Sequence, residues 1–131
     1  MESDFKVEII TPENIIFSGT TSMVTLPSYE GDMSILKNHI SIITFLRPGI
    51  IKVQKKDISF DEFFTQDGTI EYFNNNLVIL SASVNNLKNL SKDFISNLAN
   101  ETKNKLDNKD ISDHERYILN HKIDVLNIIN I

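Results

Sequence analysis

The sequence of 131 residues predicts two structural parts, an antiparallel β-sandwich or barrel followed by a hairpin of two α-helices. From Phe5 to about Val84, short apolar stretches are separated by turn residues, as in small all-β domains. All three prolines and all four glycines lie before residue 84, and beyond it apolar residues recur three or four positions apart. We therefore expect residues 1–84 to form the β-domain and residues 85–131 to form the helical hairpin.

The first four predicted strands follow from local alternation and from the residues that stop it. From Phe5 to Ile9, apolar residues alternate with charged ones, and Thr11-Pro12 ends the stretch. Further strands are expected at residues 15–17, 21–26 and 40–46. Pro27 should end the third strand, and the polar residues 28–32 should form a loop before apolar character resumes at Met33.

Four more strands are expected at residues 50–53, 58–65, 70–73 and 77–80. Asp67-Gly68 is the strongest hairpin signal in the chain and predicts a tight turn between 60–65 and 70–73. The three asparagines at 74–76 should turn the chain into the last of these strands.

The second half predicts two helices of about 16 residues each. Ser91 is a candidate N-cap, and Ser112 to Glu115 has the spacing of a capping box. The inner face of the first helix should carry Phe94, Ile95, Leu98, Ala99, Thr102 and Leu106. That of the second should carry Ile118 or Leu119, Lys122 or Ile123, Leu126, and Ile129 or Asn130. A lone hairpin of this size is marginally stable, so it should pack on the sandwich or on a partner.

Composition excludes several classes of function. A net charge of −5 provides no basic surface for nucleic acid. The absence of cysteine excludes disulfides, thiolate catalysis and cysteine-bound zinc. No apolar run approaches the length of a membrane span, and Met1 to Asp4 leads directly into strand-like sequence, so we expect neither a signal nor a transit peptide.

Catalytic and metal-binding patterns are also missing. His114 and His121 lie seven residues apart without nearby ligands to complete a metal set, and we predict no metal site. We interpret His39 as a loop hydrogen-bonder or a contact residue rather than a general base. No nucleophile elbow or glycine-rich phosphate loop occurs, which favours a binding or coupling protein over an enzyme.

The stretch from Pro27 to His39 mixes charged and apolar residues. Such a loop either lies solvated over the core or forms a recognition surface at one end of a sandwich, and composition does not separate the two.

At these residues the chain resembles the epsilon subunits of bacterial F-type ATP synthases, whose mitochondrial counterpart is called delta. The resembling segments keep the family's order and spacing over most of the first 84 residues. They are residues 5–13, Phe17-Ser18-Gly19, Leu26-Pro27 with residues 30–39, and 46–53, which include Arg47-Pro48-Gly49.

The resemblance implies a ten-stranded flattened sandwich that binds the gamma subunit and rests on the polar loops of the membrane c-ring. It implies a non-catalytic rotor subunit of the central stalk, without a cofactor, monomeric when isolated and peripheral at the cytoplasmic face of the bacterial cell membrane. The hairpin would fold against the sandwich or extend toward the alpha and beta subunits, where it would obstruct hydrolytic rotation. The implied contact residues are Glu30, Gly31, Asp32, Met33, Leu36 and His39, with Asp32 and His39 foremost.

Two departures from the family pattern matter. Asp67-Gly68 stands where the family usually has Gly-Gly, which implies a somewhat different hairpin. Members that bind ATP carry Leu or Ile followed by Asp, with Arg three residues later, whereas this chain has Leu90, Ser91 and Phe94. Without that arginine a phosphate partner is missing, so we expect weak or no nucleotide binding. The alternative function is a stand-alone small-ligand module with the hairpin as a lid, which predicts a pocket with convergent polar groups.

Overall fold

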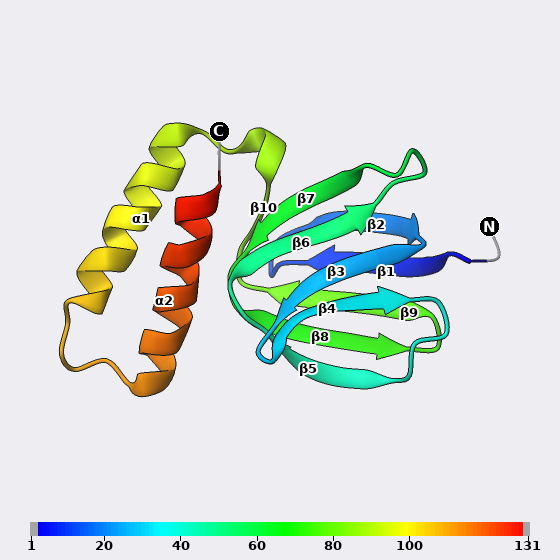
Figure 1. Cartoon of the computed structure of the whole chain (residues 1–131), viewed down its shortest axis with the longest axis horizontal. Coiled ribbons are helices and arrows are strands. Elements are labelled where there is room, and N and C mark those ends of the chain that lie inside the picture. The colour runs from blue at the N-terminus through cyan, green and yellow to red at the C-terminus, as the bar shows by residue number, and fades with distance from the viewer. Residues whose placement is uncertain (1–2, 130–131) are drawn as a thin grey trace.

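In the computed structural model, which describes residues 3–129, a ten-stranded sandwich precedes two helices, as the sequence and the resemblance predicted (Figure 1). The strands are β1 Phe5–Ile10, β2 Ile15–Thr21, β3 Met23–Ser28, β4 Gly31–Leu36, β5 Ile42–Leu46, β6 Gly49–Gln54, β7 Phe60–Thr65, β8 Gly68–Phe73, β9 Asn76–Ser81 and β10 Val84–Asn86. A short 3-10 helix, Leu87–Asn89, leads to α1 (Lys92–Leu106) and α2 (Asp113–Ile128).

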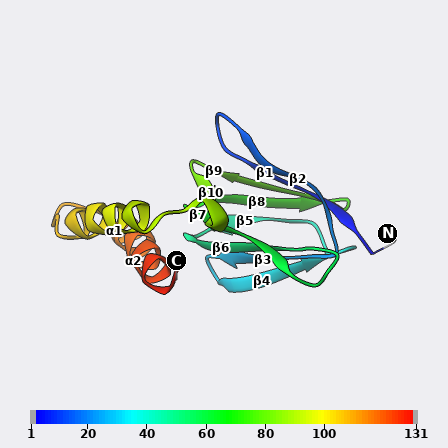
Figure 2. The ribbon, with the colours of Figure 1, turned by 90° about the horizontal axis from the view of Figure 1, so that it is seen from above.

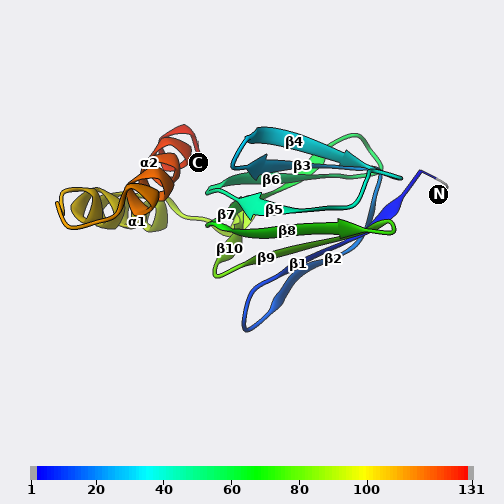
Figure 3. The same cartoon turned by 90° about the horizontal axis from the view of Figure 1, so that it is seen from below.

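The strands form two layers that share one corner. The first layer has the order β10-β7-β6-β3-β4 and the second has the order β5-β8-β9-β1-β2. The layers join where Ser28 of β3 pairs with Leu46 of β5. Neighbouring strands are antiparallel except for β1 and β9, which run parallel. Figures 2 and 3 show the two layers stacked, with the helices at one end.

Alternation along the strands fills the space between the layers. In β1, Phe5, Val7 and Ile9 are buried while Lys6 is exposed, which confirms the predicted strand. Apolar residues from both layers meet the β1 side chains in one core cluster, whose members include Val24, Leu26, Ile35, Leu46, Ile51, Val53, Phe63, Ile70, Tyr72, Leu77 and Ile79. The inner faces of both layers therefore supply one continuous core.

The prediction that Pro27 ends a strand and opens a loop is wrong. β3 continues through Pro27 to Ser28, and β4 begins at Gly31, so the turn between them is only two residues long. Gly31 adopts a positive φ of 122°, and the Ser28 hydroxyl donates to its carbonyl at 2.6 Å. Any side chain at position 49 would collide with the Pro27 ring, because a Cβ there would lie 2.5 Å from it. Proline is tolerated here because a facing glycine leaves room for the ring.

The hairpin predicted at Asp67-Gly68 is also wrong. β7 pairs with β6 and β10, whereas β8 pairs with β5 and β9, so this segment crosses between the layers. The turn predicted at the three asparagines is confirmed, because Asn74 and Asn75, with φ values of 50° and 60°, form the tight turn between β8 and β9. Gly68 serves close packing, because a Cβ there would lie 1.9 Å from the carbonyl oxygen of Leu80.

Both predicted helix starts are confirmed. The Ser91 hydroxyl accepts the N–H of Phe94 at 3.1 Å, and the Ser112 hydroxyl accepts that of Glu115 at the same distance. On the inner faces, Thr102, Ile118, Lys122 and Leu126 are buried. The inward placement of Phe94 is wrong, since its side chain is 40% exposed and the neighbouring Ile95 packs inward instead. Asn130 lies outside the described residues.

The close approach at Gly68 gives a stability prediction. Gly68→Ala should lower the free energy of unfolding by about 2 kcal/mol or more, because backbone of β8 or β9 must move to admit the methyl group. Gly19→Ala is the matched control, since its Cβ would first meet the Phe17 ring at 3.4 Å. Urea unfolding of both variants checks this, and equal stabilities would contradict it.

Candidate interaction surfaces

The predicted contact residues lie along β4, which is an edge strand because it pairs only with β3 among the described residues. Glu30 and Gly31 lie at the end of β4 nearest the hairpin, and Leu36 lies at the opposite end, followed by His39. The structure therefore distributes these residues along an edge and does not gather Asp32 and His39 at one loop. An edge strand also presents unpaired backbone N–H and C=O groups, a feature that suits contact with another chain.

Side chains of β4 alternate between the core and the solvent. Asp32, Ser34 and Leu36 are exposed, whereas Ile35 is buried and Met33 packs against the core cluster. The Asp32 carboxylate lies 3.5 Å from the Arg47 guanidinium, and the Asp32 side chain is 72% exposed. Contact through this strand would therefore involve its exposed side chains and its open backbone edge, with Met33 acting only as support.

His39 is held in place by its surroundings. Its Nδ1 donates to the carbonyl of Ile40 at 2.7 Å, and its ring meets the buried Tyr72 ring edge-on at 5.6 Å. The side-chain oxygen of Asn75, Oδ1, accepts two hydrogen bonds, one from the Tyr72 hydroxyl and one from the Asn38 N–H, each at 2.8 Å. His39 is thus a loop hydrogen-bonder, and these bonds fasten the β4–β5 loop to the β8–β9 turn.

A second surface, which we call the outer apolar face, covers the solvent side of the second layer. Large exposed side chains gather there: Ile15 (64%), Ile43 (79%), Phe45 (60%), Phe73 (65%) and Leu80 (44%). The strand register places Phe45, Leu80 and Ile15 in one row, since Phe45 pairs with Thr69, Thr69 with Leu80 and, on β1, Ile10 with both Leu80 and Ile15. Ile43 pairs with the exposed Glu71 and Phe73 with Asn76, so these two lie outside that row. This face was not predicted from the sequence, although β5 carries apolar residues at adjacent positions.

The third surface is the junction where the hairpin meets the sandwich. Phe64, on the outer side of β7, is buried against Leu90 and Leu126, with Ile95, Leu98 and Val125 packed around them. Next to this cluster, the Tyr29 ring lies 5.3 Å from that of Tyr117 and 5.9 Å from that of His114. The Tyr117 hydroxyl donates to the Tyr29 carbonyl at 3.1 Å. The hairpin is therefore docked by a small apolar cluster and an aromatic contact.

Two basic side chains of α2, His121 and Lys122, reduce the stability of this junction because they are partly or fully buried there. His121 packs on Tyr117 with ring centroids 4.4 Å apart, and burial, followed by the charge of Arg47, lowers its pKa, while Asp124 opposes the change. Lys122 is only 7% exposed. Burial, followed by the charge of Lys105, lowers its pKa, against the opposing effects of Glu101 and Asp67. Docking thus disfavours the protonated form of both groups.

The positions compared with the family's ATP motif have structural roles. Leu90 is buried in the junction cluster, Ser91 caps α1, and Phe94 is largely exposed at the start of that helix. No group of three or more potential metal-ligating side chains occurs within residues 3–129. Weak or absent nucleotide binding remains a prediction.

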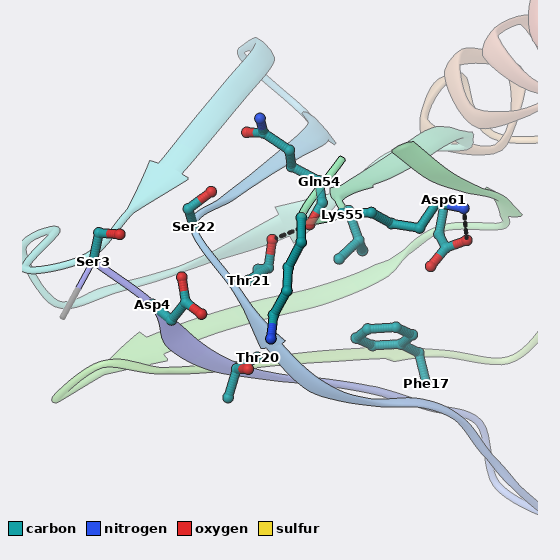
Figure 4. A pocket seen from close by; sticks show the side chains of 11 residues that line it. Ser3, Asp4, Phe17, Thr20, Thr21, Ser22, Gln54, Lys55 and Asp61 are labelled. Atoms are coloured by element: carbon teal, nitrogen blue, oxygen red, sulfur yellow. Dashed lines mark hydrogen bonds and ion pairs between the residues drawn. The ribbon is translucent and has the colours of Figure 1, made fainter. Parts of the chain in front are cut away.

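One cavity bears on the alternative of a ligand module with a helical lid. It has a volume of about 470 Å³ and is lined by residues that include Asp4, Phe17, Thr21 and Lys55 (Figure 4). The Thr21 hydroxyl donates to the Gln54 carbonyl at 2.6 Å, and Lys55 lies 3.7 Å from Asp61, so these polar groups already have partners. No hairpin residue among those described, up to residue 129, lines the cavity. The hairpin is therefore not its lid in this structure.

None of the helices described between residues 3 and 129 combines the length and apolar content needed to cross a bilayer.

The chain is similar in sequence to a known protein family and to individual proteins. The family described as "ATP synthase, Delta/Epsilon chain, beta-sandwich domain" matches residues 4–86. The ATP synthase epsilon chain of Pelagibacter ubique is 44% identical over 131 residues, which cover 99% of this chain and all of the relative. That of Sulfurimonas denitrificans is 31% identical over 101 residues, covering 77% of this chain and 78% of the relative.

Two solved structures share the fold. A chain of the mitochondrial ATP synthase of Euglena gracilis superposes with a TM-score of 0.70 at 15% identity, covering 92% of this chain and 76% of its own length. A chain from the central stalk and c-ring structure of the Tetrahymena thermophila enzyme gives a TM-score of 0.59 at 15% identity, covering 93% and 92%.

Proposed function

Because this chain belongs to the ATP synthase delta/epsilon family, we propose that its sandwich docks on the gamma subunit and the c-ring while its hairpin regulates rotation. The chain is a non-catalytic subunit of the central stalk, within a membrane-associated complex. We place it at the cytoplasmic face of a bacterial cell membrane. The observation that carries the docking proposal is the outer apolar face, because a folded chain gains nothing from exposing several large apolar side chains on one surface.

The outer apolar face fits the gamma subunit. Its apolar side chains are mounted on paired strands of one layer, so they are held in place before the partner arrives. Burial of such side chains gives roughly 25 cal/mol per Å² of apolar area removed from water. The hairpin docks at the end of the sandwich and its core cluster does not involve this face. Gamma could therefore stay bound whether the hairpin is docked or released.

A charge placed on this face should disrupt the contact. Ile43→Lys should weaken binding to the gamma subunit of the same organism by about tenfold or more, because a lysine ammonium would have to be desolvated. Ile58→Lys is the control, since Ile58 is 75% exposed but lies between β6 and β7 in the first layer. Calorimetry with the full chain measures both affinities. Unchanged binding by Ile43→Lys, with an unchanged melting temperature, would contradict this assignment.

The β4 edge is proposed as the contact with the polar loops of the c-ring. The exposed side chains of Asp32, Ser34 and Leu36 lie in a row beside an unpaired backbone edge. Because the row runs the length of β4, residues near both ends of the strand could contact the same c-ring surface although they lie far apart. The β4–β5 loop is fastened by Asn75, so His39 would extend the same surface at a fixed position.

Site-directed cross-linking tests the β4 contact, since the chain contains no native cysteine. In the assembled ATP synthase, a cysteine at the exposed Ser34 should form a bond with a cysteine placed in the polar loop of the c subunit. A cysteine at Ser18, exposed on β2 of the other layer, should not. Cross-linking from Ser18 alone, or from both positions equally, would exclude the β4 edge as the c-ring contact.

The hairpin is proposed as the regulatory element, which restrains hydrolysis when it leaves the sandwich and extends toward the alpha and beta subunits. The support is its small docking cluster, in which Phe64 is the only fully buried sandwich side chain among the described residues. A few kcal/mol of difference between two sets of contacts is enough to shift such an equilibrium.

A substitution on the sandwich tests this regulation without altering the hairpin itself. Phe64→Ala should weaken docking by about 2–4 kcal/mol, raise amide exchange in α1 and α2, and increase inhibition of ATP hydrolysis in the assembled enzyme. Phe60→Ala is the control, because Phe60 lies on the same face of β7, at the opposite end of the strand. Faster exchange in both helices without any change in hydrolysis would rule out an inhibitory role.

A further inference from the structure

His121 lines a groove in which α2 and the outer side of the first layer meet. The groove has a volume of about 660 Å³. His121 shares it with charged side chains from each neighbouring element: Asp32 of β4, Arg47 of the β5–β6 corner, Lys52 of β6, Glu62 of β7 and Asp124 of α2. The imidazole is half-buried and meets the Tyr117 ring edge-on. Its position in this groove depends on the hairpin being docked.

Burial in the groove, more than the local charges, favours the neutral imidazole. Arg47 lies in the same groove, and its guanidinium is only 3.5 Å from Asp32, so the pair is partly neutralised. Burial, followed by the positive charge of Arg47, nevertheless lowers the pKa of His121, and Asp124 offsets only part of this. Once α2 leaves the sandwich, His121 is solvated and its pKa returns toward the ordinary value of 6.5.

The sign of the linkage follows from this difference. The pKa of His121 is lower when docked than when released, so the released state binds more protons at acid pH. The contribution to docking is therefore fully present above about pH 6.5 and is lost as the pH falls through the lowered value. We propose that docking of the hairpin is a proton-sensitive latch, which neutral His121 permits and protonated His121 opens.

Lys122 sets the strength of this latch without supplying its pH response near neutrality. Its side chain is buried, with Lys105 of α1 repelling it and Glu101 of α1 and Asp67 of the sandwich attracting it. Its ordinary pKa of 10.5 is far above the range in which histidine titrates. The cost of burying this amine therefore keeps docking marginal, and a marginal equilibrium is one that a single proton can shift.

The test follows docking in the full chain as a function of pH. Cysteines at the exposed Ser18 of β2 and Asn97 of α1 accept a donor and acceptor dye, because the chain has no cysteine of its own. The docked fraction from energy transfer should stay nearly constant from about pH 8 to about pH 6.5 and fall from there to about pH 5, with the docking constant changing by at most about tenfold per pH unit, the limit for one proton. Near-ultraviolet circular dichroism checks that the sandwich stays folded.

Three variants identify the responsible group. His121→Gln should remove the pH response. His114→Gln should retain it, because His114 is exposed, although its ring also contacts the Tyr29 ring and lies 3.4 Å from the Tyr29 hydroxyl. Lys122→Met should raise the docked fraction at every pH and keep the response. If His121→Gln fails to dock, proton NMR of the unsubstituted chain decides, since the latch requires a His121 pKa below that of a solvated histidine.

Two results would overturn the proposal. One is a docked fraction of the unsubstituted chain that does not change with pH, or a His121 pKa at or above that of a solvated histidine. The other is a pH response that persists in His121→Gln or disappears in His114→Gln, which would assign the proton to another group. Both measurements use the isolated chain, so they do not depend on the proposed partners.

Discussion

The corner at which β3 meets β5 determines much of this structure. Ser28 pairs with Leu46 there, the Arg47 N–H donates to the Pro27 carbonyl at 2.9 Å, and the Tyr29 N–H donates to the Phe45 carbonyl at 3.2 Å. These bonds let the chain pass between the layers without leaving buried backbone groups unpaired. The same corner directs Tyr29 toward α2, Phe45 to the outer apolar face and Arg47 toward Asp32. One backbone arrangement thus positions residues of all three surfaces.

Features that depend on near neighbours in the chain could be predicted from the sequence. The alternation in β1 and the serine caps of both helices involve residues within a few positions of one another. The hairpin predicted at Asp67-Gly68 was wrong for the opposite reason. Turn-forming residues act locally, but strands distant in the sequence decide which layer each flanking strand joins. At Gly68 the glycine is required by the approach of β9, which no local pattern reveals.

The candidate surfaces were only partly predictable. The residues of the β4 segment were identified through the family resemblance, but they were expected in a loop, because composition does not show that residues 31–36 pair with β3. The outer apolar face was missed, since an exposed apolar residue looks like a core residue in sequence. His121 and Lys122 acquire their significance from the docked position of α2. Lys122 was placed on the inner face as one of two candidates, without its electrostatic cost.

The open edge of β4 has a consequence for the life of the subunit before assembly. A strand with one unpaired side is a template on which another copy of the chain can add a strand. The exposed Asp32 carboxylate opposes such stacking, because like charges would come close together in an edge-to-edge pair.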